Sequence, residues 1–335
     1  MSRPFLLLTC RDPATDFRRP LAEAFAALGH PVFYLWLTRR PRLTTLATGE
    51  TCDLSPWQTL RFARSLRQHP DLLVFNSTNL AFPLVSTMLR ILSGGQWCFD
   101  LHDDLLYATE GWRRLRARLA HHLLLMQADF AVHAAPTLQK LFPTSHHLGN
   151  ASALLPIQRT APDFTRILTL TSLDERFDFA LFSELAHRHP TLTFDIWGAV
   201  SKAAPTAQHD LALLQASAPN ITHRGAYDTA SLPTILGQYS VMFAPYVTPS
   251  PLTDTIDPLR YYHALNAGLE VITTPIPRAR DLANLLHLLI PGDDFGALIE
   301  RLRHGKDHRN PGTTATQFNW TTKAQRLLDI AEAAQ

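Results

Sequence analysis

Residues 257–274 read DPLRYYHALNAGLEVITT, and this stretch predicts a helix that is followed directly by a buried strand. Asp257 is a good helix N-cap, and Pro258 is a good first helical residue because no N–H is needed there. Gly268 stands where a helix ends, and the apolar run 271–273 comes next. A helix that leads into a short apolar strand is the repeating unit of a parallel α/β sheet.

The same alternation continues along the chain and predicts two doubly wound, Rossmann-like domains. The expected strands are residues 4–9, 31–36, 72–75, 97–100, 130–133, 146–148, 166–171, 191–197, 221–223, 241–244 and 271–273. The expected helices include residues 20–28, 177–187, 232–238, 258–267 and 277–286. Because the periodicity lapses at residues 151–163, the two domains are expected at 1–155 and 156–315.

Composition excludes several classes of protein. With 335 residues, of which 46% are hydrophobic and 18% are charged, the chain can bury two cores and is not a disordered protein. Its first apolar run is too short for a secretory signal, and no run approaches a membrane span, so we expect a cytoplasmic protein. Cys10, Cys52 and Cys98 lie outside any C-x-x-C pair and are expected to be buried thiols.

Common nucleotide-binding and hydrolase motifs do not occur in the sequence. No G-x-G-x-x-G follows the first expected strand, and there is no G-x-x-x-x-G-K-[ST], G-x-S-x-G or H-E-x-x-H. Dehydrogenases, common NTPases, serine hydrolases and zinc proteases therefore lose support. Ligands of open parallel sheets bind outside the carboxyl ends of the strands, so the residues just after each strand are the candidates for a site in a cleft between the domains.

Arg260 lies in the first turn of the helix expected at residues 258–267. A helix N-terminus carries unpaired N–H groups and a partial positive charge, and a guanidinium adds donors that suit phosphate oxygens. A diphosphate would fit at this helix start. The alternative is an arginine on a solvated first turn.

The whole segment resembles the signature P-L-K-x-Y-E-Y-x-A-x-G-x-P-V-V-x-T of nucleotide-sugar-dependent glycosyltransferases with the GT-B fold. The resemblance is to the bacterial polysaccharide-synthesis branch, the family 4-like group 1 transferases, and the chain is also similar to the glucuronosyltransferase of xanthan assembly. It implies that Arg260 holds the donor diphosphate beside Asp257, Pro258 and Leu259. His263 stands where this family has a ribose-binding glutamate, and the Glu-x7-Glu pair of its retaining members is absent.

A second block of the resemblance opens the second domain. Residues 173–179, LDERFDF, resemble a turn of the same branch, which implies that Arg176 reaches the phosphates. The alternative is an ion pair of Arg176 with Asp174 or Glu175. The family has a glycine just before this turn, and Thr171 stands there in this chain.

Two further blocks point toward the nucleobase and the sugar. Residues 220–227 resemble a strand whose following loop cups the base, which implies contacts from Arg224 and Tyr227; the alternative is a plain strand-to-helix loop. Tyr246 follows an expected strand in a Pro-Tyr step that leads toward the sugar site in the family. Packing is the alternative for Tyr246.

Three carboxylates, Asp100, Asp103 and Asp104, end the strand expected at residues 97–100 and resemble the v-Y-D-x-x-D-D turn of the same branch. A crowded carboxylate raises the pKa of its neighbour and makes it a better general base toward a sugar hydroxyl. We expect Asp103 to be that base, with Asp104 and Asp100 behind it. Helix capping before residues 105–107 and a magnesium site are the alternatives, whereas the resemblance implies an enzyme without a metal.

The net charge of +2 hides an asymmetry that favours an anionic partner for the first half. Residues 1–160 hold 17 Lys and Arg against 11 Asp and Glu, a net of +6, whereas residues 161–335 hold 14 against 18, a net of −4. Residues 110–126 combine four arginines with a Trp and Leu stripe, as in helices that lie on anionic membranes. The lipid-linked acceptors of the resembled branch favour this interpretation, and an ordinary basic surface helix is the alternative.

The sequence therefore predicts a GT-B glycosyltransferase, with residues 316–335 packing back on the first domain as in the resembled fold. It would transfer a hexosyl or uronosyl group from a nucleotide-sugar donor, a UDP-sugar, to a saccharide or polyprenyl-linked acceptor, with no other cofactor, no metal and no nucleic-acid partner. A base such as Asp103 suits inversion, whereas the Pro-Leu-Lys signature is typical of retaining enzymes. The alternatives are a catalytically degenerate partner or binding subunit of the same fold and a sugar-nucleotide epimerase.

Overall fold

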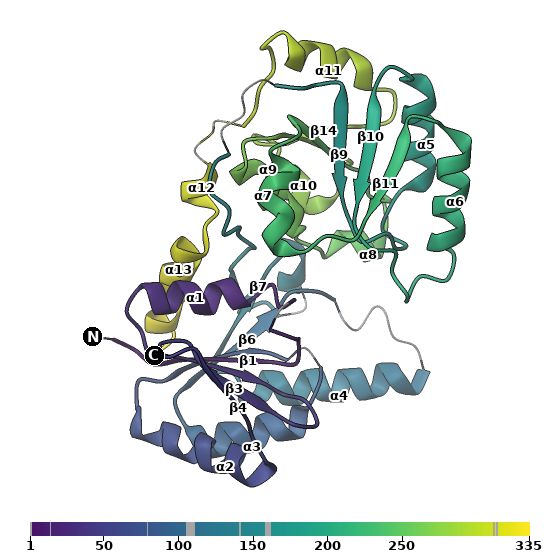
Figure 1. The fold of residues 1–335 in the computed structure, drawn as a ribbon. Helices are drawn as coiled ribbons and strands as arrows, with labels where there is room; N and C mark the ends of the chain where they lie inside the picture. The colour runs from purple at the N-terminus through teal and green to yellow at the C-terminus, as the bar shows by residue number, and fades with distance from the viewer. Residues whose placement is uncertain are drawn as a thin grey trace. The chain divides into compact units, whose positions relative to one another are not determined.

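The computed structural model describes residues 2–13, 15–78, 80–104, 111–140, 142–157, 162–310, 312 and 314–335. The chain divides into two compact units (Figure 1). The amino-terminal unit comprises the chain up to Gly149 together with Trp320–Gln335, and the carboxyl-terminal unit is Asn150–Asn319. Each unit is built on a sheet of its own that is wholly or mainly parallel.

In the described part of the amino-terminal unit the strand order is β4-β3-β2-β1-β5-β6-β7-β8. The strands are β1 (Phe5–Thr9), β2 (Val32–Trp36), β3 (Arg42–Thr45), β4 (Glu50–Asp53), β5 (Leu73–Ser77), β6 (Gln96–Leu101), β7 (Phe130–His133) and β8 (His146–His147). The β3–β4 hairpin is antiparallel, and β3 also runs antiparallel to β2. The helices are α1 (Arg19–Ala27), α2 (Pro56–Ser65), α3 (Pro83–Ser93), α4 (Gly111–Gln127) and α13 (Trp320–Ala333), which packs against α1.

The carboxyl-terminal sheet is parallel, with the order β11-β10-β9-β12-β13-β14 in the described residues. Its strands are β9 (Arg166–Leu170), β10 (Thr193–Trp197), β11 (Ile221–Gly225), β12 (Val241–Ala244), β13 (Glu270–Thr273) and β14 (His287–Leu288). The helices are α5 (Phe179–Arg188), α6 (Ala207–Ser217), α7 (Leu232–Leu236), α8 (Pro251–Asp254), α9 (Leu259–Asn266), α10 (Pro277–Asp281), α11 (Phe295–Arg303) and α12 (Thr314–Gln317). The order reverses between β9 and β12, and sheets of this kind bind ligands at that switch point.

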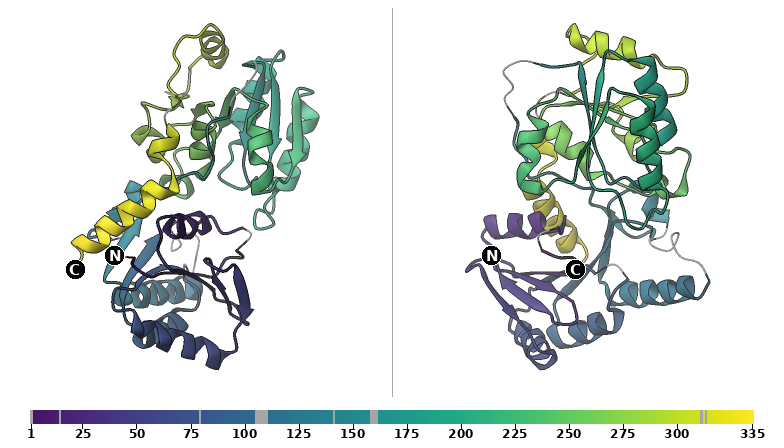
Figure 2. Two further views of the ribbon diagram at one scale, coloured as in Figure 1. Left: turned by 60° about the vertical axis from the view of Figure 1, so that its left-hand side comes forward. Right: turned by 45° about the vertical axis from the view of Figure 1, so that its right-hand side comes forward.

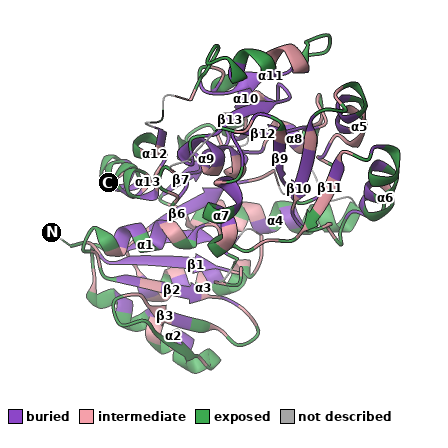
Figure 3. Cartoon of the chain, turned by 45° about the horizontal axis from the view of Figure 1, so that its top comes forward, coloured by how far each residue is buried: buried purple, intermediate pink, exposed green. Residues whose placement is uncertain are grey.

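Helices cover both faces of the carboxyl-terminal sheet (Figure 2). On one face α7, α9 and α10 pack on the sheet around Tyr261 and Leu265, and on the other α5, α6 and α11 pack around Phe182 and Phe295. Burial is concentrated in the central strands and the inner helix faces (Figure 3). Strands buried on both faces are apolar along their length, which explains why the sequence marks them so clearly.

The strands expected from the sequence are confirmed to within two residues at each end, but the β3–β4 hairpin and β14 were not predicted. All four residues of β4 are exposed, so no apolar run marks this strand. Cys52 lies on β4, and the expectation of a buried thiol is therefore wrong at this position. No described helix is long and apolar enough to cross a bilayer.

Candidate functional site

The candidate site of the carboxyl-terminal unit is built at the switch point between β9 and β12. The turn after β9 is held against the segment after β12: Phe177 forms an antiparallel bridge with Tyr246, and the Val247 N–H donates to the Arg176 carbonyl over 2.9 Å. Two segments that the sequence analysis singled out separately are thus brought together.

Arg176 forms the ion pair with Asp174 that the sequence analysis left open. Arg176 Nη2 lies 2.5 Å from Asp174 Oδ2, and Arg176 Nε lies 3.1 Å from Oδ1. The Arg176 side chain remains 37% exposed. Because exposed ion pairs contribute little, a phosphate could take the place of the carboxylate.

Tyr246 contacts several residues of this candidate site, among them Phe177, Thr274 and Arg260. The Thr274 hydroxyl accepts a hydrogen bond from the Tyr246 N–H and donates one to the Tyr246 carbonyl, each over 2.8 Å. The guanidinium carbon of Arg260 lies 5.3 Å from the centroid of the Tyr246 ring. Burial raises the pKa of Tyr246, and its buried hydroxyl has no hydrogen-bond partner among the described residues. An unpaired buried hydroxyl is costly, and it points to a ligand group nearby.

Arg260 lies in the first turn of α9, whose cap residue is Pro258. Proline offers no side-chain acceptor, and no side-chain cap bond is present at this helix start. Arg176, Arg224 and Arg278 each have a carboxylate partner. Within the described chain none is found for Arg260, which packs on the Tyr246 ring instead. A half-buried guanidinium beside an uncapped helix N-terminus is suited to binding an anion.

The expectation that Asp257 caps α9 is wrong, because its carboxylate is engaged in the core. The Asp257 side chain is fully buried and accepts hydrogen bonds from Arg278 Nε (3.0 Å), the Tyr262 hydroxyl (2.6 Å) and the Asn150 N–H (2.6 Å). Burial and the Asp257 carboxylate hold the pKa of Tyr262 well above its usual range. Asp257 therefore anchors the segment before the helix and leaves the first-turn N–H groups to other partners.

His263 lies one turn further along α9 than Arg260. Its Nδ1 is 2.8 Å from the Ser152 hydroxyl, and burial lowers the pKa of His263 to about 4. The imidazole is therefore neutral at pH 7. Within the described chain no partner is found for Nε2, which leaves this atom for a hydroxyl of a ligand.

Arg224 is held by a buried polar cluster on the sheet. Its Nε lies 2.8 Å from Asp195 Oδ1, and Asp195 Oδ2 accepts hydrogen bonds from Arg166 Nη2 and the Tyr239 hydroxyl, each over 2.8 Å. The Arg224 side chain keeps an exposed part, 42% of its surface. Its observed contact ties β11 to β10.

Tyr227 packs half-buried against the core cluster that contains Tyr246. Burial raises the pKa of Tyr227, and the charge of Arg260 opposes this shift. Of the two residues expected at the nucleobase, Tyr227 is the one that packs on the core cluster containing Tyr246.

Thr171, which stands in place of a glycine, is closely packed. A Cβ atom added at Gly198 would lie 1.4 Å from the Thr171 carbonyl oxygen. The close approach of the two backbones at this strand end therefore depends on a glycine at 198.

The acidic cluster at the end of β6 contains two kinds of carboxylate. Asp100 is fully buried and accepts hydrogen bonds from Arg18 Nη2 (2.7 Å), Arg18 Nε (2.8 Å) and the Ser77 hydroxyl (2.9 Å). Burial opposes its ionisation, but Arg18 outweighs burial and holds the pKa of Asp100 well below its usual range. Asp100 is therefore a structural anchor, whereas Asp103 and Asp104 are half-buried and stay candidates for proton transfer.

Helix capping and a magnesium site were the two alternatives for this acidic cluster. The helix expected at residues 105–107 lies outside the described residues. Among the residues that are described, no group of three or more His, Cys, Asp or Glu side chains is placed to hold a metal ion.

His102 is a candidate that the sequence analysis missed. It is 6% exposed, and neither ring nitrogen has a hydrogen-bond partner in the described structure. Its Nδ1 lies 3.6 Å from Asp100 Oδ2, which is too long for a hydrogen bond. A buried imidazole without a hydrogen-bond partner, next to Asp103 at the end of a strand, is a candidate for contact with a substrate hydroxyl. Its position directly after an expected strand was the available signal.

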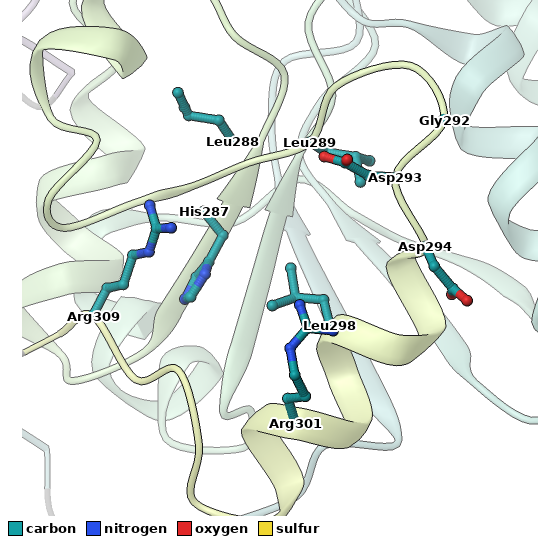
Figure 4. A pocket seen from close by; sticks show the side chains of 9 residues that line it. All are labelled: His287, Leu288, Leu289, Gly292, Asp293, Asp294, Leu298, Arg301 and Arg309. Carbon is teal, nitrogen blue, oxygen red and sulfur yellow. The ribbon is translucent and has the colours of Figure 1, made fainter.

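A hollow of 420 Å³ lies at the edge of the carboxyl-terminal sheet, between β14 and α11 (Figure 4). Two of its positive groups are engaged, since Arg309 donates to two backbone carbonyls and His287 pairs with Glu270, and Arg301 forms an exposed ion pair with Asp307. It is therefore less suited to a phosphate than the helix start at Arg260.

Comparisons with known proteins establish the class of fold. Three similar solved structures cover nearly the whole chain. They are sucrose-phosphate synthase from Thermosynechococcus elongatus (16% identity, 99% of both chains, TM-score 0.68), HepE from Anabaena in complex with UDP-glucose (15%, 98% of this chain and 99% of that one, 0.67) and a glycosyltransferase from Rickettsia africae (12%, 99% and 98%, 0.64). The chain has the GT-B fold. No protein-family model and no curated protein sequence matches it.

Proposed function

We propose that the chain is a glycosyltransferase that moves a hexosyl or uronosyl group from a UDP-sugar to a saccharide or lipid-linked oligosaccharide in polysaccharide synthesis. The observation that carries this proposal is Arg260, a half-buried cation without a carboxylate partner among the described residues, at the uncapped start of α9. The GT-B fold, and the UDP-glucose bound by HepE of Anabaena, support a nucleotide-sugar donor.

The donor diphosphate is proposed to lie against the first turn of α9. As the bond between the sugar and the diphosphate breaks, negative charge grows on the leaving oxygen, and Arg260, Arg176 and the first-turn N–H groups stabilise it. This arrangement would supply the positive charge without a metal ion. His263 Nε2 meets a ribose hydroxyl, and Tyr227 and Arg224 border the base.

The acceptor is proposed to bind the amino-terminal unit near the end of β6. Asp103 would take the proton of the attacking hydroxyl, with Asp104 beside it, if the reaction inverts. Asp100 serves this group indirectly, because its ion pair with Arg18 fixes the end of the strand.

Replacing Arg260 by alanine is expected to weaken UDP binding about 10- to 100-fold, since hydrogen bonds to charged groups contribute about 1.5–3 kcal/mol. Calorimetric titration with UDP, GDP and ADP measures the effect and identifies the base. Arg303→Ala, an exposed arginine of the same unit, is the charge-matched control and should leave affinity unchanged. Equal UDP affinity in wild type and Arg260→Ala would show that the diphosphate does not bind at this helix start.

His263 favours a second candidate, a catalytically degenerate binding or partner subunit of the same fold, because a neutral imidazole replaces a carboxylate. In a working variant of the site, His263→Glu is expected to raise UDP affinity several-fold, since a carboxylate can accept from both ribose hydroxyls. Calorimetry and release of sugar from the UDP-sugar measure affinity and turnover, and His263→Gln is the uncharged control. No response in either quantity would favour the degenerate subunit.

We further propose that α3 and α4 contact an anionic membrane surface. The two helices pack on each other and expose apolar side chains, among them Leu84 (69%), Ile91 (64%), Trp112 (69%) and Met126 (72%). Four arginines of α4, at 113, 114, 116 and 118, are exposed as well. Exposed apolar side chains together with arginines suit the interface of an anionic bilayer.

The double variant Arg113→Gln, Arg116→Gln is expected to bind vesicles of phosphatidylcholine and phosphatidylglycerol about 30-fold more weakly, at about 1 kcal/mol for each arginine. Sedimentation with the vesicles measures this, and Arg303→Gln, Lys306→Gln is the matched control in the other unit. Equal binding to pure phosphatidylcholine vesicles, or unchanged vesicle binding by the double variant, would refute the proposal that α3 and α4 contact an anionic membrane.

A further inference from the structure

A polar surface lies in the amino-terminal unit, on the face of β2, β3 and β4 beside α1. Cross-strand register aligns Tyr34, Thr44 and Thr51 in one row and Trp36, Arg42 and Asp53 in the next. Directly opposite residues of neighbouring strands point to the same face of a sheet. Because α1 packs on β1 and β2, the β3–β4 part of this face remains open.

This face forms the floor of a hollow of 510 Å³, a size typical of small-ligand sites. The hollow is lined mostly by aromatic, hydroxyl and charged side chains of α1, β2, β3 and β4. Its lining reaches from Asp12, Pro13 and Trp36, at the carboxyl ends of β1 and β2, to Leu46 and Gly49, at the β3–β4 turn beside the amino end of β2. One end of the hollow therefore lies where parallel sheets bind ligands.

The side chains of the hollow are arranged as neighbouring donors and acceptors beside an aromatic ring. Arg42 Nε lies 2.8 Å from Asp53 Oδ1, and the Arg42 guanidinium carbon lies 5.5 Å from the Trp36 ring centroid. The Thr44 and Thr51 hydroxyls are 2.9 Å apart. Trp36 Nε1 is shielded from solvent and has no hydrogen-bond partner in the described structure. A buried indole N–H of this kind requires an acceptor.

We propose that this hollow binds a saccharide unit of the acceptor, an inference that rests on the proposed function. A sugar ring combines apolar C–H faces, which pack on an aromatic ring, with adjacent hydroxyls that donate and accept. The Trp36 ring offers the first kind of contact, and Arg42, Thr44 and Thr51 offer the second. A lipid chain would instead require an apolar lining, and among the described residues that line the hollow only Leu46 and Pro13 are aliphatic.

The position of the hollow also sets a minimum length for the acceptor. In the sheet β6 is the third strand from β2, which is about 14 Å away at the usual strand spacing. A single sugar whose hydroxyl reacts beside Asp103 cannot also fill a hollow at this distance. The acceptor is therefore an oligosaccharide or longer glycan, of which an inner unit lies on Trp36.

A printed array of bacterial glycans, probed with the full-length chain in the presence of UDP, tests this site. Wild type is expected to bind a set of glycans longer than one sugar, and Trp36→Ala is expected to lose at least tenfold in signal. Trp57→Ala is the matched control, since Trp57 is a 77% exposed tryptophan on α2 of the same unit. Thr51→Arg fills the hollow from an exposed strand position and should act like Trp36→Ala without disturbing the core.

The outcomes separate this inference from the proposed function. Loss of glycan binding in Trp36→Ala and Thr51→Arg, with UDP affinity unchanged, supports the acceptor subsite. Glycan binding that depends on Trp36 in a protein without UDP affinity would leave the saccharide site standing and refute the transferase. No glycan binding by wild type, or unchanged binding in both variants, overturns the inference.

Discussion

Replacing Arg18 by methionine is expected to lower the free energy of unfolding of the amino-terminal unit by about 3–5 kcal/mol, because breaking a buried ion pair leaves an uncompensated charge. Both side chains of the Arg18–Asp100 pair are 0% exposed. Scanning calorimetry of the full chain measures the loss, which corresponds to a fall in Tm of about 10 °C for a unit of this size.

The pH dependence of stability in the same variant tests whether the loss comes from an unpaired Asp100 carboxylate. In the wild type the pKa of Asp100 is depressed, so its contribution to stability is present above the unfolded value near 3.9 and is lost as pH falls below it. Without Arg18, burial raises the pKa of Asp100, and protonation of the acid then relieves the cost. The stability gap between variant and wild type should narrow as pH falls from 7 to 4.

The matched control is the exposed pair Arg19–Glu23, one residue further along the chain. Its side chains are 45% and 50% exposed, and Arg19→Ala should cost only about 0.3–0.5 kcal/mol. An Arg18→Met variant as stable as Arg19→Ala would contradict the assignment of Asp100 as a structural anchor.

Replacing Asp257 by alanine is expected to destabilise the carboxyl-terminal unit by a similar amount, about 3–5 kcal/mol. Arg278, 6% exposed, would keep its charge without its closest carboxylate, and Tyr262 and Asn150 would lose an acceptor. UDP affinity should fall as well, because Asp257 directly precedes the cap residue of α9, the helix at whose start UDP is proposed to bind. Calorimetric unfolding and UDP titration of the same sample measure both effects.

Asp281→Ala is the control for this variant. Asp281 lies 3.7 Å from Arg278 and is 45% exposed, so its removal should cost less than about 1 kcal/mol and leave UDP affinity unchanged. Asp257→Asn retains an acceptor for the Tyr262 hydroxyl and should fall between the two. If Asp257→Ala were no more harmful than Asp281→Ala, α9 would not depend on this anchor.

The sequence predicted the buried strands because strands covered on both faces are apolar throughout, as β12 is. It also placed Arg260 at a helix start, since the signals for a helix terminus are local. The β3–β4 hairpin was missed because β4 is entirely exposed and its pattern is polar.

The roles of the buried acids could not be predicted for a different reason. The partner of Asp100 lies 82 residues away in the chain, and Asp257 is paired with an arginine 21 residues further on. Local spacing led to the predictions that Asp257 is an N-cap and that Asp100 belongs to a catalytic cluster. Only the fold brings Arg18 and Arg278 to these carboxylates.

A crystal structure of the full chain soaked with UDP would show where the donor diphosphate binds. We expect the diphosphate at the first turn of α9, within hydrogen-bonding distance of Arg260 and beside Tyr246, with the base near Tyr227. UDP bound elsewhere, such as in the hollow between β14 and α11, with Arg260 still packed on Tyr246 and free of phosphate, would contradict it.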